Sequence, residues 1–230
     1  MVLALFVMAR GATPGHAACL SVDAAALENI AESAVSIAEI IAKLGGDGEP
    51  TYLFVGERHQ VGAVKRFVVD LANALVEQGF DVGLYVEGFQ TGCAPEDGAC
   101  WSLARAFRTE AFHRLLELSQ APVYPIDPPD RGDRTRKMAE VIAAGTEAVR
   151  IVLVGNSHVL HAGDPDAELW VYGGGIRYPD PGDLVEAFPR EQTLTFALRR
   201  ATLAADVPYL VWADGCAADY SLFTGYSSDY

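Results

Sequence analysis

The chain has 230 residues, of which 50% are hydrophobic and 21% are charged, a composition typical of a folded protein and unlike that of a disordered one. This length suits one large domain with a substantial core. The formal net charge of −14 at pH 7 repels phosphate backbones, so we expect no binding to nucleic acid.

The N-terminus, residues 1–17, is predicted to be an export signal. Val2–Ala9 is a short apolar run that is too short to span a bilayer, and small residues precede a cleavage site after Ala17. Residues 18–230 would then form a periplasmic or secreted protein. Alternatively, Cys19 partly fits a lipobox, and the protein would be held at a membrane only if this residue is lipidated.

The four cysteines suit an oxidising compartment. They allow three sets of pairings. Cys93 and Cys100 enclose a short segment with the turn-forming residues Pro95, Asp97 and Gly98, so a local disulfide is favoured. A second disulfide between the remaining two cysteines would then join the two ends of the chain.

Beyond the signal, helical periodicity alternates with continuously apolar runs that are typical of buried strands. The predicted helices are Val22–Leu44, Val64–Leu75, Trp101–Leu118 and Asp133–Ala144. The regular predicted strands are Thr51–Val55, Val82–Val86, Pro122–Ile126 and Arg150–Val154, and the less regular ones are Leu169–Tyr172, Thr193–Leu198 and Tyr209–Trp212. Such alternation forms right-handed βαβ units. The sequence therefore predicts a single α/β domain with a mainly parallel central sheet flanked by helices and a less regular, mixed C-terminal part.

Two segments of the form Gly-x-x-His follow the first and fourth predicted strands. They are Gly56–His59 and Gly155–His158, and the whole chain contains only five histidines. Because ligands bind at the carboxyl ends of parallel strands, we expect both segments to contribute to one site.

Carboxylates also end strands of the regular half, with Glu57 after the first strand, Glu87 after the second and Asp127 after the third. Any one of them can be a helix cap or a buried structural group. Together with two imidazoles, however, they form a ligand set that suits a divalent transition metal. The same groups can also act as general acid and base without a metal. Arg134 opens a predicted helix, where it would either clamp an anion or oxyanion or pair with nearby acidic residues.

In chain order, these segments resemble the superfamily that includes haem-binding ChaN lipoproteins, Tiki and TraB-type proteins, and erythromycin esterases. The resemblance covers residues 52–158, and its matching segments are Gly56–His59, Val86–Phe89, Arg134–Ala139 and Gly155–His158. It implies a shared α/β core whose site is formed by the two Gly-x-x-His segments, the glutamate and the arginine. Thr135 stands where ChaN-like proteins often have Asp, and Gln60 and Val61 stand where they often have an acidic residue and Asn.

The favoured function is an exported hydrolase that cleaves an ester or amide bond of a small-molecule or peptide substrate with activated water. In this hypothesis His59, Glu87 and His158 hold a divalent transition metal or position the water directly. Glu57 is the general base, and Arg134 is the anion or oxyanion clamp. The alternatives are a non-catalytic haem- or metal-uptake protein that uses the same cleft, and an interaction module that has kept the fold. The sequence gives no indication of the oligomeric state.

Overall fold

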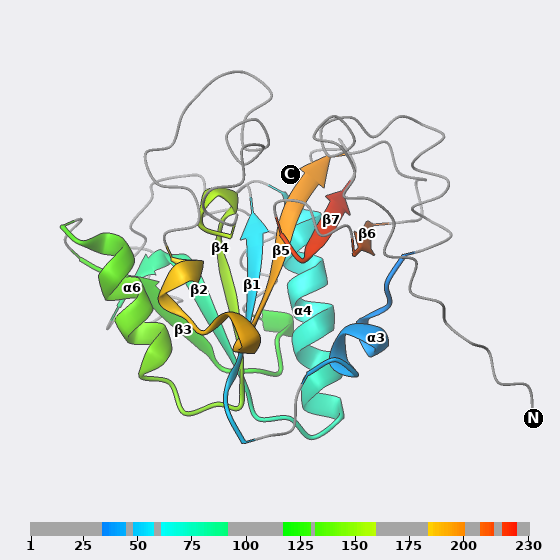
Figure 1. Cartoon of the computed structure of the whole chain (residues 1–230), viewed down its shortest axis with the longest axis horizontal. Helices are drawn as coiled ribbons and strands as arrows, with labels where there is room; N and C mark the ends of the chain where they lie inside the picture. The colour runs from blue at the N-terminus through cyan, green and yellow to red at the C-terminus, as the bar shows by residue number, and fades with distance from the viewer. Residues whose placement is uncertain are drawn as a thin grey trace, which may run out of the picture.

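The structure is a computed structural model that describes residues 34–44, 48–57, 61–91, 117–129, 132–159, 184–200, 208–213 and 218–224. Within these residues, seven strands form one sheet in the order β3-β2-β4-β1-β5-β7-β6 (Figure 1). Neighbouring strands are parallel except for β6 and β7, which pair antiparallel. The carboxyl ends of the six parallel strands therefore lie at one edge of the sheet.

The strands are β1 (Thr51–Glu57), β2 (Val82–Gln90), β3 (Val123–Asp127), β4 (Val149–Gly155), β5 (Thr193–Arg200), β6 (Tyr209–Trp212) and β7 (Tyr220–Thr224). The α-helices are α3 (Ile37–Ile41), α4 (Gly62–Glu77) and α6 (Arg134–Ala143). Short 3₁₀ helices follow as η2 (Asn156–His158), η3 (Val185–Ala187) and η4 (Arg190–Gln192).

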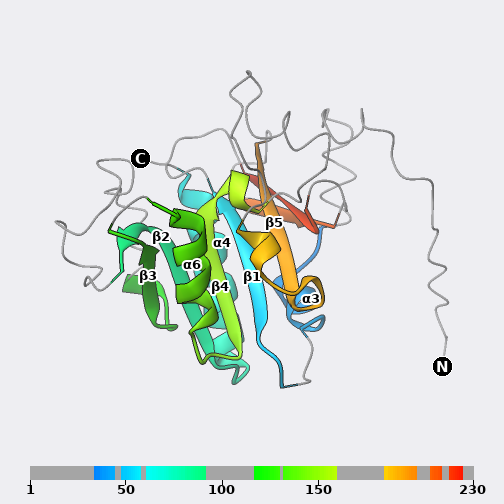
Figure 2. The same ribbon diagram turned by 60° about the vertical axis from the view of Figure 1, so that its left-hand side comes forward.

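Two hydrophobic clusters cover the two faces of the sheet, because side chains along a strand alternate between faces. On β1, Leu53 and Val55 pack in the cluster that contains α4, whereas Tyr52 and Phe54 pack in the cluster that contains α6. Figure 2 shows α6 in front of the sheet and α4 behind it. The two helices lie on opposite faces because both crossovers are right-handed but run in opposite directions across the sheet. The chain moves toward β3 when it passes from β1 to β2, and away from β3 when it passes from β3 to β4.

The predicted fold class is confirmed as a single α/β domain with a mainly parallel sheet, flanking helices and a mixed C-terminal part. The predicted helix Val22–Leu44, however, is confirmed only in part over its described residues, because only Ile37–Ile41 is helical. Residues 34–36 are not helical, and α3 begins only after Ser36, which forms a capping box with Glu39. The preceding backbone pairs with the sheet instead, since the N–H of Val35 donates to the carbonyl of Val211 at 2.7 Å.

Strand β7 was missed by the sequence interpretation. All five of its residues are buried, between β5 and β6. The predicted strand Leu169–Tyr172 lies outside the described residues, and so does most of the predicted helix Trp101–Leu118. Within the described residues, no helix combines the length and hydrophobicity needed to cross a membrane.

Candidate functional site

The two Gly-x-x-His segments leave the sheet side by side. Strands β1 and β4 are parallel neighbours, and Glu57 stands opposite Gly155 in their register. Both segments therefore start at the same edge of the sheet. His158 is half-buried in η2, directly after β4. His59 lies outside the described residues, as do all four cysteines and the predicted export signal.

Position 56 has to be a glycine because the side chain of Asn156 crosses over it. β1 lies between β4 and β5, and Asn156, which follows β4, accepts a hydrogen bond at its Oδ1 from the N–H of Leu198 on β5 at 2.6 Å. A Cβ on Gly56 would lie 2.2 Å from this Oδ1 and 2.7 Å from Cγ2 of Val159. The glycine thus leaves room for the link that holds the second Gly-x-x-His segment over the first strand.

Substituting Gly56 by Ala is expected to destabilise the fold, because the methyl group would displace Asn156 or break its hydrogen bond. The expected loss is about 1–3 kcal/mol. Gly155→Ala is the matched control, since a Cβ there would meet its nearest atom, Oε2 of Glu87, at 3.5 Å, an ordinary contact. Urea denaturation of both variants tests this difference. An equal loss of stability in the two would show that the crossing side chain does not constrain Gly56.

Glu87 and His158 both approach Gly155. Oε2 of Glu87 accepts a hydrogen bond from the N–H of Gly155 at 2.5 Å. A Cβ placed on Gly155 would lie 3.5 Å from this oxygen and 3.8 Å from Cδ2 of His158. The carboxylate and the imidazole therefore lie close to the same point beside this glycine.

Arg134 is held between two buried carboxylates at the start of α6. Its Nη2 donates to Glu87 at 2.5 Å and also to Asp127, and its Nε donates to Asp127 at 2.8 Å. The arginine side chain is 27% exposed, and no hydrogen bond joins its Nη1 to any of the described residues. Among the described residues, nothing therefore accepts the two N–H groups of Nη1, which a ligand could use.

Burial alone would lower the pKa of Arg134, but the charges of Glu87 and Asp127 and their hydrogen bonds outweigh this effect and raise it. The guanidinium therefore stays charged. Two carboxylates against one guanidinium leave a formal charge of −1 on this cluster. The cluster suits a neutral hydrogen-bond acceptor, such as a carbonyl oxygen, better than a fully charged anion.

Asp127 had no assigned role in the hypothesis drawn from the sequence. Its Oδ2 accepts a hydrogen bond from the N–H of Gly88 at 2.8 Å, while its Oδ1 holds Arg134. The residue thus joins β2, β3 and α6 at the carboxyl edge. Its position at a strand end, seven residues before Arg134, was the available signal.

Glu57 lies apart from this cluster, because it is buried and forms an ion pair with Lys65 of α4. Both side chains are on the α4 side of the sheet, whereas Arg134 belongs to α6. Lys65 was also missed by the sequence interpretation. The signal was a lysine among the buried positions of an otherwise apolar helix face.

The described contacts of Glu87 suit a residue that orients Arg134 and Gly155. A divalent cation bound to the same carboxylate would lie beside the guanidinium, and charge repulsion disfavours this arrangement. Among the described residues, no three His, Cys, Asp or Glu side chains are grouped so that they could hold a metal ion. One of the three expected metal ligands, His59, lies outside the described residues, whereas Glu87 and His158 are described.

The candidate site is therefore an edge of the sheet at which a half-buried imidazole, an oriented guanidinium and buried carboxylates come from four different elements. Comparisons of this chain with protein-family models, with curated proteins and with solved structures returned no match.

Proposed function

We propose that this protein is an exported hydrolase, similar to members of the ChaN, Tiki and erythromycin esterase superfamily, that cleaves an ester or amide bond with activated water. The observation that carries the proposal is Arg134, which is held by Glu87 and Asp127, and whose partner Glu87 bonds Gly155, the glycine that His158 also approaches. The cluster has no net positive charge, so its contribution comes from directed N–H donors, whose hydrogen bonds strengthen as negative charge develops on a carbonyl oxygen.

In this mechanism the substrate carbonyl accepts hydrogen bonds from the available N–H groups of Arg134. Negative charge grows on that oxygen as water attacks, so the interaction strengthens in the transition state. A histidine, His158 or His59, accepts the proton of the attacking water and then donates a proton to the leaving group. Glu87 and Asp127 keep the guanidinium in place.

A divalent metal, when bound to His59 and His158, would lower the pKa of a bound water and supply a hydroxide at neutral pH. Glu87 would join this ligand set only by giving up its contact with Arg134. Water activation by the metal and by histidine alone are distinguished by chelation, as described in the Discussion.

Substituting Arg134 by Lys is expected to lower kcat for ester hydrolysis by about 10²–10³-fold, because lysine keeps the charge but loses the planar donor fork. Arg136→Lys is the matched control, since Arg136 is 61% exposed on the same helix and pairs with Asp133 and Glu140. Hydrolysis of uncharged p-nitrophenyl esters measures the effect, and circular dichroism checks the fold. A folded Arg134→Lys variant with the wild-type kcat would overturn the assigned role.

Binding of haem is the competing function. It predicts a Soret band when the wild-type protein is incubated with haem, loss of the band in His158→Ala, and no hydrolysis of any ester or amide. That combination of results would replace the hydrolase proposal with haem uptake.

Export is part of the proposal and predicts two disulfides in the mature protein, one of them between Cys93 and Cys100. Peptide mapping under non-reducing conditions, on protein isolated from its native compartment, should recover this linked pair. Four free thiols would contradict both the pairing and the export. A diacylglyceryl group on Cys19 would identify a lipoprotein instead and would leave one cysteine unpaired.

A further inference from the structure

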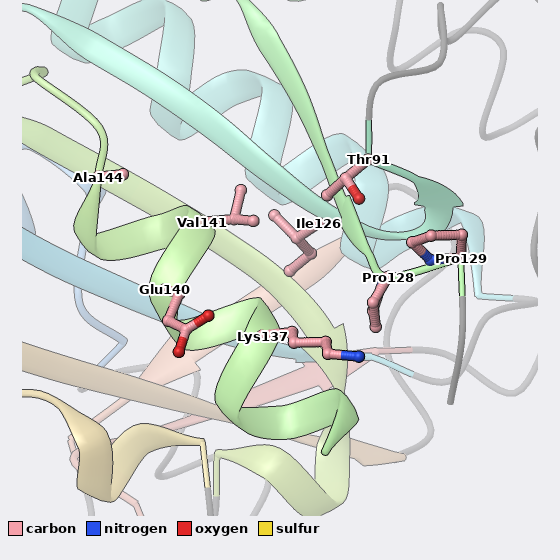
Figure 3. A pocket seen from close by; sticks show the side chains of 8 residues that line it. All are labelled: Thr91, Ile126, Pro128, Pro129, Lys137, Glu140, Val141 and Ala144. Carbon is pink, nitrogen blue, oxygen red and sulfur yellow. The ribbon is translucent and has the colours of Figure 1, made fainter. Parts of the chain in front are cut away.

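A pocket of about 440 Å³ lies between α6 and the chain that follows β3. Ile126, Pro128, Val141 and Ala144 give it a mainly apolar lining. Figure 3 shows the side chains of Ile126, from β3, and Val141, from α6, beside one another between the strand and the helix. A pocket of this size and character suits a medium-sized apolar group.

The pocket adjoins the Arg134 cluster along the chain and along the helix. Asp127, which holds Arg134, stands between the lining residues Ile126 and Pro128. Its carbonyl also accepts a hydrogen bond at 2.7 Å from the N–H of Thr91, another lining residue.

The helix makes the same connection. Arg134 and the lining residues Lys137, Val141 and Ala144 recur at intervals of three or four residues, so they lie along one side of α6. Arg134 is not itself a lining residue and lies about one helical turn from Lys137, so a ligand bound there by its carbonyl would have to extend an attached group along the helix to enter the pocket.

Charge favours an uncharged ligand. The cluster around Arg134 carries a formal charge of −1, and the charged residues of the pocket lining, Lys137 and Glu140, are of opposite sign. The chain as a whole carries −14. A free carboxylate would therefore be bound less tightly than a neutral ester or amide with the same hydrocarbon chain.

We propose that this pocket binds the apolar acyl group of an uncharged ester or amide substrate whose carbonyl lies at Arg134. The proposal rests on the hydrolase function proposed above and adds a substrate class to it. The pocket sets the preference for acyl length, while Arg134 and the histidines carry out the reaction.

The proposal can be tested by substituting an exposed lining residue with a larger side chain that fills the pocket. Ala144 is exposed and lines the pocket, so Ala144→Trp should block it at little cost to the fold. Ala143 is also exposed and is not among the lining residues, so Ala143→Trp is the matched control.

With the full chain, we expect kcat/KM for p-nitrophenyl octanoate to exceed that for p-nitrophenyl acetate. Ala144→Trp should lower the octanoate value by at least about tenfold and leave the acetate value unchanged. Ala143→Trp should alter neither value. Equal effects on the two esters, or the same effect in both variants, would overturn the pocket assignment.

A binding measurement separates this proposal from the hydrolase function. Calorimetry should detect N-methyloctanamide binding to the wild type and to Ala143→Trp but not to Ala144→Trp, and octanoate should bind at least about tenfold more weakly. Amide binding without hydrolysis of any ester would leave the pocket in place and overturn the hydrolase function. Hydrolysis without amide binding would overturn the pocket, and octanoate binding as tight as that of the amide would overturn the preference for uncharged ligands.

Discussion

Replacing either His59 or His158 with alanine is expected to abolish hydrolysis while the protein remains folded. Loss of a general base or metal ligand should lower kcat by about 10²–10⁴-fold, because the group acts in the transition state. In His158→Ala, stability should fall by only about 1 kcal/mol, since a half-buried side chain at the edge of the sheet makes few core contacts. Steady-state kinetics and thermal unfolding measure the two effects.

Ser157→Ala is the matched control, because Ser157 lies in η2 beside His158 and is also half-buried. Its kcat should remain close to that of the wild type. If water is activated by a metal, chelation should inactivate the wild type, and added divalent ion should restore it but should not restore either histidine variant. If chelation has no effect and the histidine variants are inactive, a histidine acts directly as the base. Unfolding of the His158 variant would show that this residue is structural.

Substituting Lys65 by Met should give the largest loss of stability, about 3–5 kcal/mol. It removes a cation from the buried carboxylate of Glu57 and so leaves a charge in a medium of low dielectric constant. Adding Glu57→Gln to this variant should recover part of the loss, because the remaining charge is then removed as well. Chemical denaturation with a common m-value measures both steps.

Arg66→Met is the control for this prediction. Arg66 is the next residue of the same helix, but its side chain is 67% exposed and its nearest ion-pair contact, with Asp70, is 4.0 Å long. An exposed pair of this kind contributes little to stability. If the Lys65 and Arg66 variants have the same free energy of unfolding, the buried pair does not stabilise the fold.

These stability variants also bear on the role of Glu57. If Glu57 is the general base, Glu57→Gln should lower kcat as strongly as the histidine substitutions do. Its ion pair with Lys65, on the side of the sheet away from Arg134, favours a structural role instead. We therefore expect the double variant, once refolded, to retain more activity than His158→Ala.

The sequence by itself determined the α/β class and the positions of the regular strands. Continuous apolar runs form strands that are buried on both faces, and helical periodicity between them can only cover such a sheet. The same patterns located the polar residues that end the strands, and they located Arg134 at the start of a helix. These features depend on local spacing, which is visible in the chain itself.

Only the tertiary structure decided which of these residues meet. The strand order places β4 beside β1, so two segments about a hundred residues apart leave the sheet together. It also places β1 beneath the hydrogen bond from Asn156 to β5, so Gly56 must lack a side chain. Pairing with the sheet also keeps residues 34–36 out of the helix, where the local apolar pattern predicted continuity. Strand order and partner choice depend on contacts between distant residues, and no local periodicity in this sequence encodes them.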